Sequence, residues 1–309
     1  MSWFASRIIL FVVPVLLLLA ALETSLRRLP NHCAFTNHYL LHSGREVEIL
    51  VLGGSHAFNG VDPEGLGDQA FNAANVAQDH RLDRAVLERY IDSLPRLRCI
   101  ILPVSYCSIG SRMELSGEPW RIKNYAIHMG LREPGMGLDM RFELMTGKIS
   151  AAVGRLVDHW NDDGSDIVFR PHGGSPGRPQ PGIDMDEHGL ATAKRHTKWP
   201  SGPFEANVLE LERIIELAEG RGISVLLFSP PAYESYRRHL NGKQLALSRL
   251  TPQRLARENA HVHYLDLMAD PQFTVEDFGN SDHLQGSGNR KLTAILARAI
   301  ASSPEPRSH

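Results

Sequence analysis

Cysteine is scarce in this chain, and two common zinc-binding patterns, the Cys-x-x-Cys pair and the His-Glu-x-x-His motif, are missing from it. Three cysteines among 309 residues are too few for a disulfide scaffold. Fifteen histidines are many, yet the sequence has no Cys-x-x-Cys pair and no His-Glu-x-x-His motif. We therefore expect no metal ion and no other cofactor.

Charge of one sign is also lacking. The formal net charge is -2, so the chain has no global basic field of the kind that attracts nucleic acid, and we expect no nucleic-acid partner. Residues 53–58 read Gly-Gly-Ser-His-Ala-Phe, which is not the Gly-x-Gly-x-x-Gly loop of a dinucleotide-binding domain. With 42% hydrophobic and 22% charged residues, the composition is that of an ordinary globular protein.

One long apolar run is present, from Ile8 to Leu22 near the amino terminus. Counted from Trp3, it reaches the roughly 20 residues that a membrane-spanning helix needs. No clear Ala-x-Ala cleavage site follows, which favours an uncleaved anchor over a signal peptide. Arg7 favours a cytoplasmic amino terminus, whereas the two arginines at 27–28 favour the opposite orientation. We expect an anchor over residues 1–24 with the rest of the chain outside the cytoplasm.

The body of the chain alternates apolar strands with amphipathic helices. We predict strands at 47–52, 70–74, 98–104, 223–228 and 262–267. We predict helices at 79–94, 204–219, 234–258 and 289–300. This order predicts a parallel sheet with right-handed crossovers.

Between residues 108 and 200 the periodicity weakens, and only 147–160 reads as a helix. A long insertion of this kind is usually a lid or a binding loop. We expect a linker at 25–46 and one α/β domain at 47–309 that contains the insertion.

The first strand runs directly into Gly53, Gly54 and Ser55. Glycine lets the backbone turn sharply, so Ser55 is expected at the carboxyl end of a strand, where open α/β folds bind ligands. The alternative is an ordinary turn in which Ser55 caps the next helix.

A polar loop from Asp277 to Gly288 precedes the last helix and holds the adjacent pair Asp282 and His283. Because parallel strands end at the same edge of a sheet, Ser55 and His283 can meet there. A serine hydroxyl needs a base to become nucleophilic, and the base needs a third group that fixes its tautomer. The alternative is that Asp282 caps a turn and His283 is solvated.

These stretches together resemble the SGNH/GDSL hydrolases. More closely, they resemble the membrane-anchored SGNH-like proteins of polysaccharide and teichoic-acid acyl transfer, including alginate O-acetylation and D-alanyl transfer proteins. Four segments carry the resemblance: 52–56, 70–79, 100–105, and 282–284 with the later Gly288. The resemblance covers about 48–108 and 203–301. It implies a flavodoxin-like three-layer α/β sandwich of about five parallel strands, with Ser55 as nucleophile and His283 as base.

The group that orients His283 departs from the family's pattern. Asn280 stands three residues before His283, where the family has aspartate. Its carbonyl can accept from a histidine, as asparagine does in Cys-His-Asn triads. Asp282 and Asp277 are the other candidates for this role.

The oxyanion hole departs as well, because the family's glycine and asparagine are not plainly present. Ala77 stands near the glycine position, and its backbone N–H could serve together with that of Ser55. Asn75 or Ser105 could supply the side-chain donor.

The resemblance implies a membrane-anchored acyltransferase or esterase that acts on acyl groups, such as acetyl, of a secreted polysaccharide or lipid-linked glycan. It also implies a membrane-bound acyltransferase as a partner. The expected location is a bacterial inner membrane, crossed once, with the catalytic domain in the periplasm or outside the cell. The alternative is a catalytically inactive member that binds glycan or assists assembly, which Asn280 in place of aspartate favours.

Overall fold

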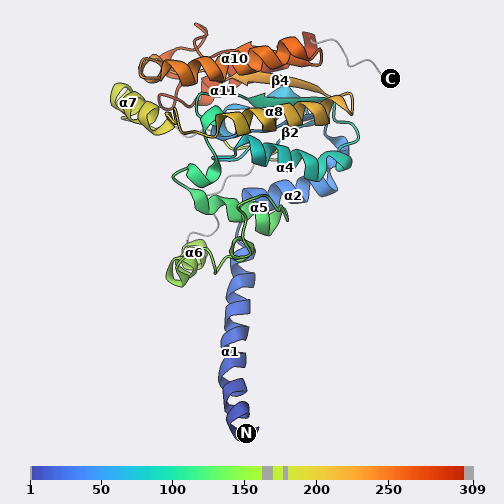
Figure 1. Ribbon diagram of the computed structural model, residues 1–309, viewed down its shortest axis with the longest axis vertical. Helices are drawn as coiled ribbons and strands as arrows, with labels where there is room; N and C mark the ends of the chain where they lie inside the picture. The colour runs from blue at the N-terminus through green and yellow to red at the C-terminus, as the bar shows by residue number, and fades with distance from the viewer. Residues whose placement is uncertain (1, 162–169, 177–179, 303–309) are drawn as a thin grey trace. The chain divides into compact units, whose positions relative to one another are not determined.

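The chain divides into two compact units (Figure 1). The computed structural model describes residues 2–161, 170–176 and 180–302. The anchor unit comprises residues 1–37 and 120–167. The sheet unit comprises residues 38–119 and 168–309.

The sheet unit is built on a five-stranded parallel sheet with the order β2-β1-β3-β4-β5. The strands are β1 (Ile49–Val51), β2 (Ala70–Asn72), β3 (Cys99–Pro103), β4 (Ser224–Ser229) and β5 (Val262–Asp266). In the register of the sheet, Val51 lies between Asn72 and Ile101. This order is that of flavodoxin-like folds, in which ligands bind where the direction of strand addition reverses, between β1 and β3. The α/β class and the parallel sheet predicted from the sequence are confirmed.

Helices cover both faces of the sheet, which explains why its strands are apolar on both sides. Ile49 and Val51 belong to a core cluster that also contains Leu292 of α11 (Gly286–Ser302). The short helix α3 (Ser55–Gly60) packs against α11 on this face. Right-handed crossovers then place α4 (His80–Tyr90), α8 (Phe204–Glu219) and α10 (Gly242–Glu258) on the opposite face.

Residues 25–46, for which the sequence predicts a linker, are largely helical. Helix α1 (Ser2–Arg27) continues to the start of this segment, and α2 (His32–His42) fills most of the rest. The Asn31 side chain starts α2, because its Oδ1 accepts hydrogen bonds from the backbone N–H groups of Cys33 (2.8 Å) and Ala34 (3.4 Å). Helix α2 has almost no apolar stripe, so the periodicity of apolar residues does not reveal it.

The insertion at 108–200 is more helical than the sequence indicated. The predicted helix at 147–160 is α6 (Ile149–Asn161), but α5 (Ile122–His128) and α7 (Met185–His196) were missed. Helix α7 begins at Asp184, whose carboxylate accepts from the N–H groups of Asp186 (2.9 Å) and Glu187 (3.0 Å). Residues 162–169 and 177–179 of the insertion lie outside the described ranges.

The anchor unit contains one helix long and apolar enough to cross a membrane. This segment, Ser6–Arg27, has a mean hydropathy of 2.5 in its most apolar window, and its leucines at 10, 16, 17 and 18 are exposed. At its polar end, the Glu23 carboxylate accepts hydrogen bonds from the backbone N–H groups of Glu143 (3.0 Å) and Leu144 (3.1 Å). These bonds tie the end of α1 to the rest of its own unit.

Candidate active site

The loop after β1 places Ser55 at the edge of the sheet. Gly53 has a φ of +115°, and a Cβ there would lie 2.5 Å from the Pro103 ring, so only glycine fits. Its N–H donates to Oδ1 of Asp83, a fully buried carboxylate on α4, at 2.7 Å. Ser55 follows as the first residue of α3. The loop is therefore fixed by β3 and α4, two elements that lie outside the Gly-Gly-Ser motif.

The loop before α11 places His283 through a tight turn. Phe278 and Leu284 form an antiparallel bridge, which closes the base of this turn. Within it, Oδ1 of Asn280 accepts hydrogen bonds from the backbone N–H groups of Asp282 (3.1 Å) and His283 (2.9 Å). Asn280 thus has a clear structural role in addition to any role beside the ring.

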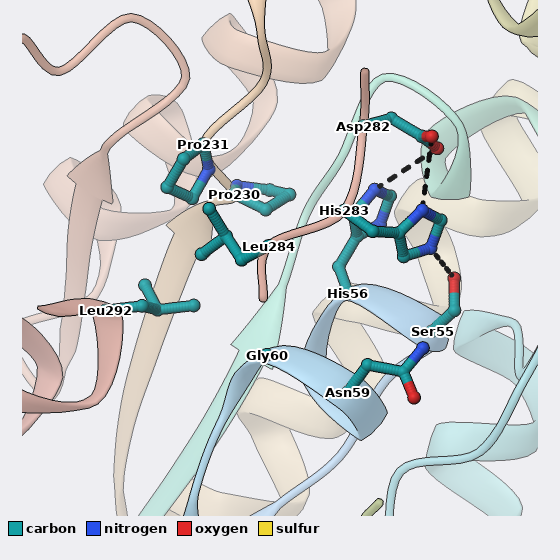
Figure 2. A pocket seen from close by; sticks show the side chains of 10 residues that line it. All are labelled: Ser55, His56, Asn59, Gly60, Pro230, Pro231, Asp282, His283, Leu284 and Leu292. Atoms are coloured by element: carbon teal, nitrogen blue, oxygen red, sulfur yellow. Dashed lines mark hydrogen bonds and ion pairs between the residues drawn. The ribbon is translucent and has the colours of Figure 1, made fainter. Parts of the chain in front are cut away.

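The Ser55 and His283 side chains meet at the edge of the sheet (Figure 2). The Ser55 Oγ lies 2.8 Å from the His283 Nε2, although the two residues are 228 positions apart. That distance is within the range expected for a nucleophile and its general base. Both side chains also line a cavity of about 370 Å³.

Two oxygens approach the other nitrogen of the His283 ring. Nδ1 lies 3.1 Å from Oδ1 of Asp282 and 3.3 Å from Oδ1 of Asn280. The Asp282 side chain is 1% exposed, and within the described residues neither of its oxygens makes a well-directed hydrogen bond. Asp282 therefore acts on the ring mainly through its charge. Asp277, the third candidate, instead accepts from Nζ of Lys291 at 2.6 Å.

The charge of Asp282 controls the titration of the site. Burial lowers the pKa of His283, but the Asp282 carboxylate raises it more, so the pKa of His283 lies above its ordinary value of 6.5. Burial raises the pKa of Asp282, but the neighbouring imidazoles, His283 foremost, together lower it well below its ordinary value, so the carboxylate stays ionised. Burial and the charge of His283 lower the pKa of His56 to about 3, which keeps its ring neutral.

His56 was not singled out from the sequence, although it directly follows Ser55. Its ring stacks on that of His283, with centroids 4.9 Å apart and an interplanar angle of 10°. The ligand atoms of His56, Asp282 and His283 lie within 4.8 Å of one another, close enough for a metal ion to bridge them. The two rings stack rather than converge, so the geometry suits proton transfer better than coordination.

The four candidates for the oxyanion hole are placed differently. Ser55, Ala77 and Ser105 line the 370 Å³ cavity, and Asn75 is not among its lining residues. The side-chain oxygen of Asn75 accepts from the N–H of Val76 at 2.8 Å. As the first residue of a helix, Ser55 has an N–H outside the helical hydrogen-bond ladder.

Ala77 adopts a left-handed backbone conformation, with a φ of +59°, at the wall of the cavity. This conformation is unfavourable for a residue with a side chain, by about 1–2 kcal/mol. Ala77 also stands near the position at which the resemblance to SGNH/GDSL hydrolases expects a glycine. Such strain tends to be retained at functional sites.

Comparison with known proteins finds only distant similarity. No protein family and no curated protein sequence matches the chain. A solved structure of a proposed platelet activating factor from Streptococcus pneumoniae is 13% identical, with 94% of this chain and 98% of that one covered and a TM-score of 0.45.

Two structures from Bacteroides are similar to the same degree. A GDSL-like lipase from Bacteroides thetaiotaomicron is 11% identical over 88% of this chain and 96% of its own, with a TM-score of 0.44. A proposed acylhydrolase from Bacteroides fragilis is 10% identical over 87% and 96%, with a TM-score of 0.42. Likeness at this level establishes neither family nor activity, so the functional argument depends on the site itself.

Proposed function

We propose that this protein is a serine-dependent acyl-transferring enzyme of the SGNH type, an esterase or an O-acyltransferase. The observation that supports this most is the 2.8 Å contact between the Ser55 hydroxyl and the His283 ring at the wall of an open cavity. A buried carboxylate lies on the far side of that ring. The nucleophile Ser55, the base His283 and the Asp282 carboxylate thus lie in the order that acyl transfer requires.

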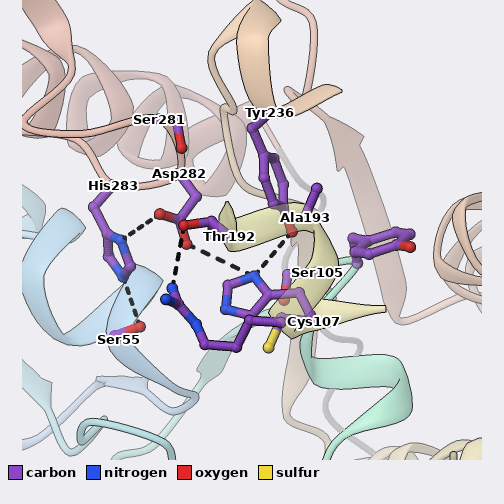
Figure 3. Close-up of polar contacts among 12 residues, drawn as sticks. Ser55, Ser105, Cys107, Thr192, Ala193, Tyr236, Ser281, Asp282 and His283 are labelled. Carbon is purple, nitrogen blue, oxygen red and sulfur yellow. Dashed lines mark hydrogen bonds and ion pairs between the residues drawn. The ribbon is translucent and has the colours of Figure 1, made fainter. Parts of the chain in front are cut away.

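In the first step, Nε2 of His283 takes the proton of Ser55 as Oγ attacks the carbonyl carbon of an ester. The imidazolium that forms has its Nδ1–H directed toward Asn280, and the charge of the nearby Asp282 carboxylate (Figure 3) stabilises it. His283 then gives the proton to the leaving alcohol as the acyl-Ser55 ester forms. The backbone N–H groups of Ser55 and Ala77 are the proposed donors to the oxyanion.

In the second step, an acceptor hydroxyl takes the acyl group from Ser55, with His283 again as base. We propose that the acceptor is a hydroxyl of a cell-surface or lipid-linked glycan, and that the acyl group is small, such as acetyl. Helix α1 would keep the enzyme at a bacterial inner membrane, with the sheet unit outside the cytoplasm. A membrane-bound acyltransferase is the proposed partner that delivers the acyl group.

Labelling with a serine-directed fluorophosphonate tests the proposal on the full chain in detergent micelles. We expect one label on Ser55, its loss in Ser55→Ala, and labelling slowed about 10³-fold or more in His283→Ala. Ser116→Ala is the matched control, because Ser116 lines the same cavity but its hydroxyl donates to the carbonyl of Met113. A folded protein that takes no label would contradict the proposal and support the inactive, glycan-binding alternative.

A further inference from the structure

The anchor unit exposes large apolar side chains outside α1. Helix α6 exposes four of them, and the segment before it exposes three more. They are Leu138, Phe142, Met145, Ile149, Val153, Val157 and Trp160. Trp160 is the most exposed, at 78%. Apolar side chains gathered in this way mark a contact with a membrane or with a partner.

The four side chains on α6 form one stripe. Ile149, Val153, Val157 and Trp160 recur at intervals of three and four residues, which places them on one side of the helix. We call these four residues the α6 stripe. The opposite side is polar or small and exposed, with Ala151 and Asp158. Helix α6 is therefore amphipathic, and its apolar side faces outward.

An ion pair fixes the rotation of α6. Nη2 of Arg155 lies 2.7 Å from Oε2 of Glu143, a buried carboxylate that also pairs with Nζ of Lys123 at 2.7 Å. Arg155 stands two residues from both Val153 and Val157. Residues two apart in a helix point in nearly opposite directions. The ion pair that holds Arg155 against its own unit therefore turns the α6 stripe away from it.

The same glutamate places α6 at the polar end of α1. The backbone N–H groups of Glu143 and Leu144 donate to the carboxylate of Glu23. Glu23 is the first polar residue after the apolar run that ends at Leu22. Helix α6 also packs against α1, as Figure 1 shows. The α6 stripe thus adjoins the apolar surface of α1 near the point where that surface ends.

We propose that the α6 stripe inserts into the surface of the membrane from which α1 emerges. This inference rests on the membrane attachment proposed above. An amphipathic helix at such a place lies in the plane of the membrane, with its apolar side in the boundary between headgroups and acyl chains. Trp160 suits that depth, because an indole ring has an apolar body and a polar N–H.

Continuity with α1 favours lipid over a protein as the occupant of the stripe. On the sheet unit, exposed large apolar side chains are distributed over separate helices. Examples are Leu41 on α2, Leu190 on α7, Leu209 on α8 and Leu250 on α10. In the anchor unit they adjoin a helix that is itself exposed along its apolar length. One bilayer covers both surfaces.

The test measures the depth of a fluorophore on opposite sides of α6 in the full chain. Val153→Cys and Ala151→Cys are each made with Cys107→Ala, labelled with a nitrobenzoxadiazole and reconstituted in vesicles of phosphatidylethanolamine and phosphatidylglycerol. The two remaining cysteines are buried. Val153 and Ala151 are both exposed, so neither label disturbs packing. Nitroxide lipids should place the label at 153 about 5–10 Å into the headgroup and acyl boundary. Aqueous iodide should quench the label at 151.

A third label, on Leu17→Cys in α1, reports the membrane attachment separately. A label at 17 that lies deep in the bilayer, with the label at 153 open to iodide, would overturn this inference and leave the attachment in place. A label at 153 protected from both iodide and nitroxide lipids would show that protein covers the stripe, and would also overturn it. A label at 17 open to iodide would remove the attachment, and this inference with it.

Discussion

Among single residues, Asp282 has the widest influence, because its buried carboxylate faces three imidazole rings. His283 must be neutral to accept the Ser55 proton, and its pKa lies above 6.5. Activity should therefore rise with pH, with its midpoint above that value. Asp282→Asn removes the charge that raises the pKa of His283 most, while burial and His196 still lower that pKa, so the midpoint should fall. The plateau of kcat for p-nitrophenyl acetate should drop about 10²–10⁴-fold.

Asn280→Ala provides the comparison at the same imidazole nitrogen. It removes an uncharged oxygen 3.3 Å from Nδ1 and keeps the Asp282 charge. The Asp282 charge still raises the pKa of His283, so the midpoint should stay above 6.5. The plateau should fall by at least about ten-fold, because the contact with Nδ1 and the two hydrogen bonds from the backbone of the turn are lost together. Equal midpoints in the two variants would show that Asp282 does not set the titration of His283.

Ser55 could be predicted from the sequence because it directly follows a strongly apolar strand and two glycines. His283 could be predicted because it lies in a distinctly polar loop between the last strand and the last helix. The place of His56 beside His283 could not. It depends on which side chains face the cavity, and no local pattern records that. Asn75 does not line the cavity and its side-chain oxygen accepts a hydrogen bond within its own turn, so its part in the oxyanion hole stays a prediction.

At the level of elements, the turn between β1 and α3 controls the position of the nucleophile. Gly53→Ala combines a positive φ with a Cβ placed 2.5 Å from the Pro103 ring. We expect the free energy of unfolding to fall by about 2–4 kcal/mol. Because the loop must shift, kcat/KM should fall about 10²-fold. Urea unfolding and ester hydrolysis measure the two effects.

Gly67→Ala is the matched control for this turn. Gly67 has a similar φ of +125°, but a Cβ there meets nothing within 4 Å. Only backbone strain is added, which costs about 1–2 kcal/mol and leaves the site unchanged. If both variants lost activity equally, displacement of the nucleophile loop would not be the cause.

The elements that periodicity predicted well are those with a strong apolar signal. Helix α8 has the bounds predicted for it, and all five strands lie close to the expected positions. Helix α2 escaped notice because it has almost no apolar stripe, and α7 because polar residues outnumber apolar ones on it. They begin at the side chains of Asn31 and Asp184, which cap them.

For the whole molecule, the apolar helix predicts stable membrane attachment. An arginine at the centre of a spanning helix costs about 2.5–3.5 kcal/mol. Leu17→Arg with Leu18→Arg should therefore move the protein from the alkaline-resistant membrane fraction to the soluble fraction. Hydrolysis of a small soluble ester should persist.

Leu41→Arg with Leu250→Arg is the control for added charge. Both leucines are exposed on the sheet unit, at 45% and 60%. This variant should stay in the membrane fraction. If the α1 double variant also resisted alkaline extraction, membrane insertion of α1 would be excluded as the means of attachment.

The order of apolar and polar stretches along the chain was enough to establish the α/β class, the parallel sheet and the apolar first helix. Burial of apolar surface drives those features, and it leaves a local periodic signature. The contact between Ser55 and His283 and the position of the Asp282 carboxylate near three imidazole rings arise only when the strands assemble. Those contacts join residues far apart in the chain, and their energies depend on burial that no single segment can produce.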